Sequence, residues 1–137
     1  MGAWGTGVFD NDTACDWADE LEESDDLSVL EEALELVLAA GADYIEAPDA
    51  EQALAAADVI ARLQGNAGDS GAYTETVDAW VSGNKFKVPP VLAKKALTAI
   101  ERILVEPSEL LELWSESEEF GAWRSGIENL KSRIGTS

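Results

Sequence analysis

The chain has 137 residues, 46% of them hydrophobic, and a net charge of −19 from 28 acidic and nine basic residues. This length and composition predict one packed domain spanning residues 1–137. The scarcity of basic residues argues against binding to nucleic acid or to an anionic membrane surface. A single cysteine excludes an internal disulfide, and neither a bilayer-spanning apolar run nor a secretory leader is recognised, so we expect a cytoplasmic location.

The negative charge is concentrated in the first part of the chain. Residues 1–61 contain seventeen acidic and no basic residues, whereas residues 62–137 contain eleven acidic and nine basic residues. A field of this sign suits a basic protein partner. Acidity that serves only to keep the protein soluble is the alternative interpretation.

The opening segment, MGAWGTGVFDND, predicts an extended N-terminal strap that packs on the helices. Its glycines would let the backbone lie close to helices, and Trp4 and Phe9 would fill core positions. Asp10, Asn11 or Asp12 is expected to cap the first helix. The segment lacks the preceding strand and the lysine of phosphate loops, and its acidic residues do not follow the spacing of a calcium loop.

The next two helices are predicted to be amphipathic, with acidic outer faces. The apolar stripe of the first consists of Ala14, Trp17, Ala18 and Leu21, and that of the second consists of Leu27, Leu30, Leu34, Val37 and Leu38. Ser28 and Glu31 match a capping box at the start of the second helix. The carboxylates that we expect to contact a basic partner are Asp16, Asp19, Glu20, Glu23, Asp25, Asp26, Glu31, Glu32 and Glu35.

The rest of the chain predicts further helices. Asp49 and Gln52 mark the start of an alanine-rich helix, whose small side chains favour a central position among its neighbours. The glycine-rich loop 65–71 follows, and then come helices over 73–81, 91–104, 108–114 and 120–134. We therefore predict an all-α, compact bundle of about six helices without strands.

The sequence offers little for catalysis. It has no histidine, which excludes a Ser-His or Cys-His nucleophile pair. Nearby carboxylates should raise the pKa of Cys15 and make it a poor nucleophile. Asp12, Asp16, Asp19 and Glu23 share a helix face that suits a hard cation, so a carboxylate-only divalent-cation-binding protein or enzyme is the alternative function. The main interpretation includes no catalytic residue, metal or cofactor.

A helical oligomer is a third interpretation. It requires an exposed apolar patch in the second half of the chain, which contains Trp80, Phe86, Trp114 and Trp123. Each of these aromatic residues, taken singly, is expected in the core.

Several segments of the chain resemble a bacterial family known as domain of unknown function 4259. In order, they are MGAWGTGVFDND with the acidic helix after it, EALELVLAAGADYIEAP, ALAAADVIARLQG, SELLELW and AWRSGIENLKSRI. The resemblance implies a small bacterial protein and brings no activity, cofactor or site residue. By analogy with other families of small acidic proteins, we expect a protein-binding module of the immunity or inhibitor kind, which neutralises a basic partner such as a bacterial toxin.

Overall fold

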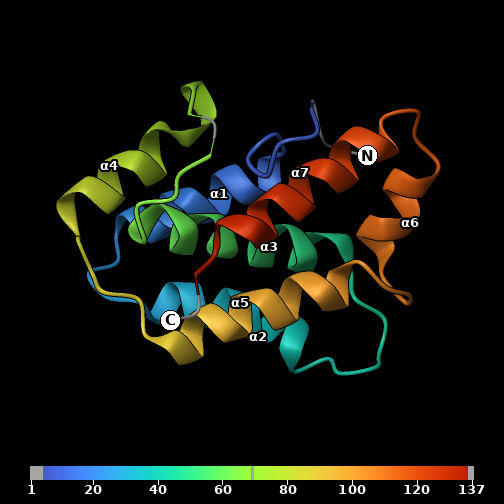
Figure 1. Cartoon of the computed structure of the whole chain (residues 1–137), viewed down its shortest axis with the longest axis horizontal. Coiled ribbons are helices and arrows are strands. Elements are labelled where there is room, and N and C mark those ends of the chain that lie inside the picture. The colour runs from blue at the N-terminus through green and yellow to red at the C-terminus, as the bar shows by residue number, and fades with distance from the viewer. Residues whose placement is uncertain (1–4, 69, 136–137) are drawn as a thin grey trace.

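The computed structural model describes residues 5–68 and 70–135, and these form seven α-helices and one 3₁₀ helix (Figure 1). The elements are α1 (Asp12–Glu22), α2 (Ser28–Leu38), α3 (Ala47–Leu63), η1 (Ala72–Thr74), α4 (Glu75–Gly83), α5 (Pro90–Ile103), α6 (Glu109–Ser115) and α7 (Phe120–Arg133). The described residues contain no strand, only an isolated bridge between Ile45 and Ser108. The all-α prediction is confirmed, with seven helices rather than six.

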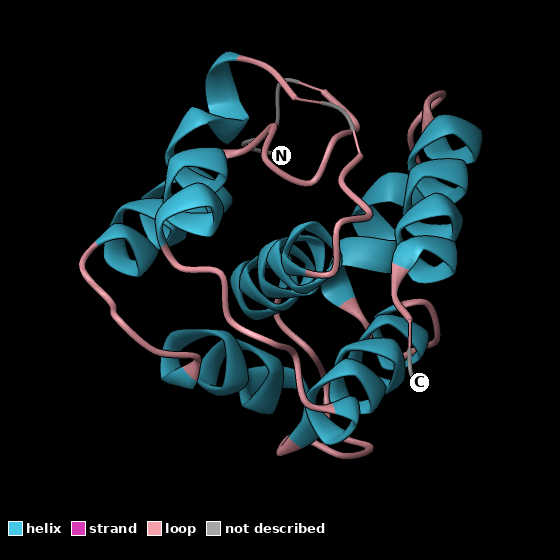
Figure 2. Ribbon diagram, turned by 60° about the vertical axis from the view of Figure 1, so that its left-hand side comes forward, coloured by secondary structure: helices cyan, strands magenta, loops and turns pink. Residues whose placement is uncertain are grey.

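Helix α3 occupies the centre of the bundle, as its sequence predicted. Every residue from Ala53 to Arg62 is buried, and α3 contacts each of the other six α-helices. Figure 2 shows a helix in the middle of the view with others arranged around it. Alanine side chains allow this close approach because they extend little beyond the backbone. No helix in the described part of the chain is long and apolar enough to cross a bilayer.

The start of α3 differs from the prediction. The helix begins at Ala47, two residues before the expected Asp49, and no side chain near its N-terminus caps it. Instead the backbone N–H of Ala47 donates to Oε1 of Glu109 at 2.7 Å. The cap therefore comes from a residue 62 positions away, which no local sequence pattern reveals.

Arg102 joins the two loops that flank the contact between Ala47 and Glu109. The guanidinium of Arg102 on α5 donates to four backbone carbonyls, those of Gly41, Asp43, Val105 and Pro107. Backbone hydrogen bonds from Ile45 to Pro107 and from Glu109 to Ile45 complete the junction. The α2–α3 loop and the α5–α6 loop are thus held together.

The caps of the first two helices bear out one prediction and correct another. Oδ1 of Asn11 accepts the N–H of Ala14 at 2.8 Å, which confirms a cap from the Asp-Asn-Asp run. The predicted capping box at α2 is wrong. Ser28 is the first residue of α2 rather than its cap, and the Asp26 carboxylate accepts both its backbone N–H and its hydroxyl. Glu31 points instead toward α5, where it pairs with a lysine.

The aromatic residues of the second half belong largely to the core. Trp80, Trp114 and Trp123 are buried, and Phe86 is half-buried against Trp80. The Trp80 indole N–H donates to the carbonyl of Ser24 at 2.8 Å, and Trp114 stacks on Trp123. These residues therefore do not form the exposed patch on which the oligomer interpretation depends.

The N-terminal segment is described from Gly5 onward, so the predicted burial of Trp4 lies outside the described residues. Phe9 fills a core position as expected. Gly5 and Gly7 have a different role from the predicted one, because a β-carbon at either would collide with the side chain of Asp10 rather than with a helix. Oδ2 of Asp10 accepts the N–H of Gly7 at 2.9 Å, so the small residues make room for a local turn.

Candidate functional site

The carboxylates expected on α1 all face solvent. The buried face of α1 consists of Ala14, Trp17, Ala18 and Leu21, as the periodicity predicted. The remaining positions of the helix are exposed or half-buried, and the carboxylates of the following loop are exposed. We call the six predicted carboxylates of α1 and this loop the α1 acidic surface, which consists of Asp16, Asp19, Glu20, Glu23, Asp25 and Asp26.

The α1 acidic surface keeps its negative charge. Among residues 5–68 and 70–135, the ion pairs of the structure involve none of its six carboxylates. Hydrogen bonds from the side chain and the backbone of Ser28 lower the pKa of Asp26 below its usual value, so this carboxylate remains ionised at neutral pH. Like charges at this spacing repel one another, and a bound cationic surface would relieve that repulsion.

The expected site residues on α2 have a different environment. Nζ of Lys95 on α5 lies 2.9 Å from Glu31 and 3.1 Å from Glu35, whereas Glu32 is exposed. The hydrogen bonds that Lys95 donates to these two carboxylates raise the pKa of its ammonium group. Helix α1 packs mainly on α3 and α4, and α2 mainly on α3 and α5. The nine predicted residues therefore divide into an uncompensated group on α1 with its loop and a partly compensated group on α2.

Cys15 has the environment that the sequence predicted. Its thiol is half-buried and donates to the carbonyl of Phe9 at 3.3 Å. Burial raises the pKa of the thiol, and the carboxylates of Asp12, Asp19 and Asp16 raise it further. In the described ranges, no three acidic or cysteine side chains come together as they would around a metal ion. The carboxylates on α1 thus line a surface without converging on a point.

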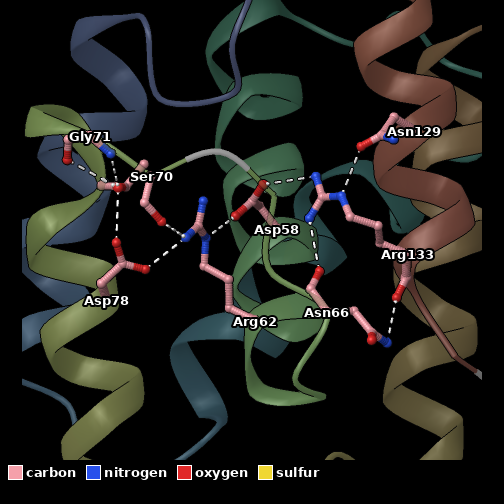
Figure 3. A network of polar contacts seen from close by, with 9 residues as sticks. Asp58, Arg62, Asn66, Ser70, Gly71, Asp78, Asn129 and Arg133 are labelled. Carbon is pink, nitrogen blue, oxygen red and sulfur yellow. Dashed lines mark hydrogen bonds and ion pairs between the residues drawn. The ribbon is translucent and has the colours of Figure 1, made fainter.

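A second polar site, which the charge pattern of the sequence did not predict, lies between α3, α4 and α7. Asp58 and Arg62 face each other one turn apart on α3, and their side chains are 6% and 3% exposed. Figure 3 shows the Asp58 carboxylate between two guanidinium groups, those of Arg62 and of Arg133 from α7. Nη1 of Arg62 also lies 2.7 Å from Asp78 on α4. This buried network joins α3, α4 and α7.

The network remains charged because its groups compensate one another. Burial alone would lower the pKa of the Arg62 guanidinium, but Asp58 and Asp78 outweigh it, and the pKa is raised above its ordinary value. Ser70 accepts from Arg62, and Thr74 donates to Asp78. The sequence did carry a signal for this network. One acidic and one basic residue stand one turn apart in ALAAADVIARL, a helix predicted to be central.

A cleft of about 400 Å³ lies beside this network. Its walls come from the N-terminal loop, the loop that follows α3, η1 and α7, and its charged residues within the described part of the chain are Asp10, Asp58, Arg62 and Arg133. Gly68 allows the loop to approach α7, because a β-carbon there would lie 2.8 Å from the guanidinium of Arg133. Gly126 of α7 also lines the cleft, and a β-carbon there would meet no atom within 4 Å.

The fold and these two sites define a helical protein with an acidic exterior and a charge-compensated polar network in its interior. The chain belongs to the family described as Domain of unknown function (DUF4259), whose model matches residues 2–126. This match confirms the resemblance that the sequence segments indicated. No curated protein and no solved structure matches the chain.

Proposed function

We propose that this protein is an acidic interaction module, which uses the α1 acidic surface to bind a basic protein. The observation that supports the proposal is the exposure of six carboxylates that form no ion pair within the described residues. A surface of this kind attracts a cationic partner over long range and raises the association rate.

The narrower form of the proposal is an inhibitor or immunity protein for a basic toxin. In a nuclease, the basic residues that bind phosphates would be the natural contacts for closely spaced carboxylates. The ordered bundle beneath α1 supports this form, because carboxylates fixed on a rigid helix lose little conformational freedom on binding. Membership of the DUF4259 family is compatible with the proposal and does not specify it.

The test compares two variants with the same net charge. One neutralises Asp16, Asp19, Glu20 and Glu23 to their amides. The control neutralises four other exposed acidic residues, Glu75, Glu116, Glu118 and Glu128. The wild-type chain is used as bait in an extract of its source organism, and each captured basic protein is purified and titrated with all three chains.

We expect the α1 variant to slow association by at least about tenfold, and the control variant to change it little. The wild-type affinity should fall as salt is added, because exposed charges are screened. Equal losses in the two variants, or an affinity that does not depend on salt, would contradict the proposal. Loss of the partner's nuclease activity on binding would support the inhibitor form.

A further inference from the structure

The cleft beside the buried network is a site separate from the α1 acidic surface, and its lining carries both signs of charge. Two of the four arginines in the sequence, Arg62 and Arg133, line it together with Asp10 and Asp58. Among the residues that the structure describes, the charged lining is therefore balanced, although the protein as a whole is strongly acidic. This balance sets the cleft apart from the rest of the molecule.

The two arginines differ in their access to the cleft. Arg62 is turned inward toward Asp58 and Asp78, with 3% of its side chain exposed. Arg133 keeps 18% of its side chain exposed, and its Nη2 atom lies 3.4 Å from Asp58, which is long for a charge-assisted hydrogen bond. A carboxylate in the cleft would give this guanidinium a closer acceptor. Asn129 and the carbonyl of Asn66 hold its other nitrogens in place.

The N-terminal loop supplies the opposite charge. Asp10 is half-buried in this loop and lines the same cleft. The N–H of Gly7 binds its Oδ2 atom and fixes the orientation of the carboxylate. Because Asp10 and Arg133 come from different walls of the cleft, a molecule between them would meet an acceptor for a cation on one side and a donor to an anion on the other.

The charge of the whole protein narrows the class of ligand. An anion is repelled by a net charge of −19, and a simple cation has no group that could accept a hydrogen bond from Arg133. A zwitterion has no net charge and complements both sides of the lining. We propose that the cleft binds a small zwitterion of the free α-amino acid class, with its carboxylate on Arg133 and its ammonium group on Asp10. The volume of about 400 Å³ has room for such a molecule and its side chain.

The structure offers a matched pair of variants that test the cleft without removing any charged group. A β-carbon at Gly126 meets no atom within 4 Å, and this residue lines the cleft. Gly121 lies on the same helix with equally open space around it and is not among the residues lining the cleft. Gly126→Leu should place an apolar side chain at the cleft and hinder binding there, and Gly121→Leu should also replace a glycine of α7 and leave the cleft open.

The experiment is ligand-detected saturation-transfer NMR on the full chain with each standard L-amino acid at millimolar concentration. We expect at least one amino acid to bind the wild-type protein and the Gly121→Leu variant, and none to bind Gly126→Leu. For that amino acid, the N-acetyl and methyl ester forms, which each lack one charge, should bind at least about tenfold more weakly.

Three results would overturn the proposal: no binding of any amino acid, binding that survives in Gly126→Leu, or equal binding of a singly charged analogue. The comparison of analogues uses the wild-type protein, so it tests the proposed binding mode even where a variant fails to fold. Because no residue of the α1 acidic surface is involved, the outcome is independent of the proposed partner.

Discussion

Arg62 and Asp58 form an ion pair inside the central helix, with 2.5 Å between Nε and Oδ1 and almost no exposure of either side chain. Charged groups this deep in a protein are tolerated only when their partners are in place. The pair therefore makes the core of this bundle sensitive to loss of a single charge.

The first prediction concerns the loss of one partner. Arg62→Met leaves the buried Asp58 carboxylate with only the longer contact to Arg133, and we expect the free energy of unfolding to fall by about 3–5 kcal/mol. Asp78→Asn, at a side chain that is 38% exposed, should cost about 1 kcal/mol. Urea denaturation followed by circular dichroism measures both. Equal losses would show that the Asp58–Arg62 pair has no special role in stability.

The second prediction concerns the cap of α1. Asn11→Ala removes the acceptor for the N–H of Ala14 and should lower the free energy of unfolding by about 1–2 kcal/mol. Asn11→Asp loses the Nδ2 donor to the Val8 carbonyl, but it keeps the acceptor for Ala14 and adds a negative charge at the positive end of the helix, so it should cost less than Asn11→Ala. Thermal and urea denaturation of the two variants provide the comparison. If Asn11→Asp lowers the free energy of unfolding as much as Asn11→Ala does, the result would argue against the cap.

The third prediction is a dependence of stability on pH. Glu51 of α3 is partly buried, and this burial raises the pKa of its carboxyl, with a smaller contribution from Glu109. The folded state then holds a proton more tightly than the unfolded state, so the stability that Glu51 contributes falls as the pH rises through the interval above its ordinary pKa. Glu51→Gln should raise the melting temperature at pH 7 and have little effect below about pH 4.

Calorimetry at both pH values measures this difference, with Glu75→Gln as a control at an exposed position. Glutamine can still accept the hydrogen bond from Thr13, so that contact is kept. An increase in melting temperature of the same size at the two pH values would contradict the prediction, because the raised pKa of Glu51 cannot produce it.

The fourth prediction concerns the reactivity of Cys15. Burial and the neighbouring carboxylates raise the pKa of its thiol, so the thiolate fraction at neutral pH is small and alkylation should be slower than for free cysteine. Asp12→Asn removes the largest carboxylate contribution and should speed the reaction about two- to threefold at low salt. The rate of iodoacetamide alkylation as a function of pH measures this effect. A rate that does not respond to Asp12→Asn would exclude the electrostatic explanation.

The sequence predicted most of the helices because each one has to bury an apolar stripe, and the spacing of Ala14, Trp17 and Leu21 reveals such a stripe without knowledge of its partner. The start of α3 could not be predicted in this way, since its cap comes from Glu109 across the bundle. The same holds for Lys95, whose pairing with the α2 carboxylates depends on how α2 and α5 pack.

The two candidate sites also differ in whether local sequence or long-range packing determines them. Exposure of the α1 carboxylates follows from helical periodicity alone, because their positions alternate with buried ones. The cleft requires the N-terminal loop, the loop after α3 and α7 to meet, and these segments are distant in the sequence. Asp58 and Arg62 stood out as charges in an apolar helix, but only the packing of α4 and α7 supplied Asp78 and Arg133 as their further partners.

The four carbonyl contacts of Arg102 have a consequence for local opening. Two connections that are far apart in the chain share one side chain and are bonded to each other through the backbone of Ile45, so each loop loses contacts when the other detaches. The two loops should therefore behave as a single cooperative unit in amide hydrogen exchange and become accessible to proteases together.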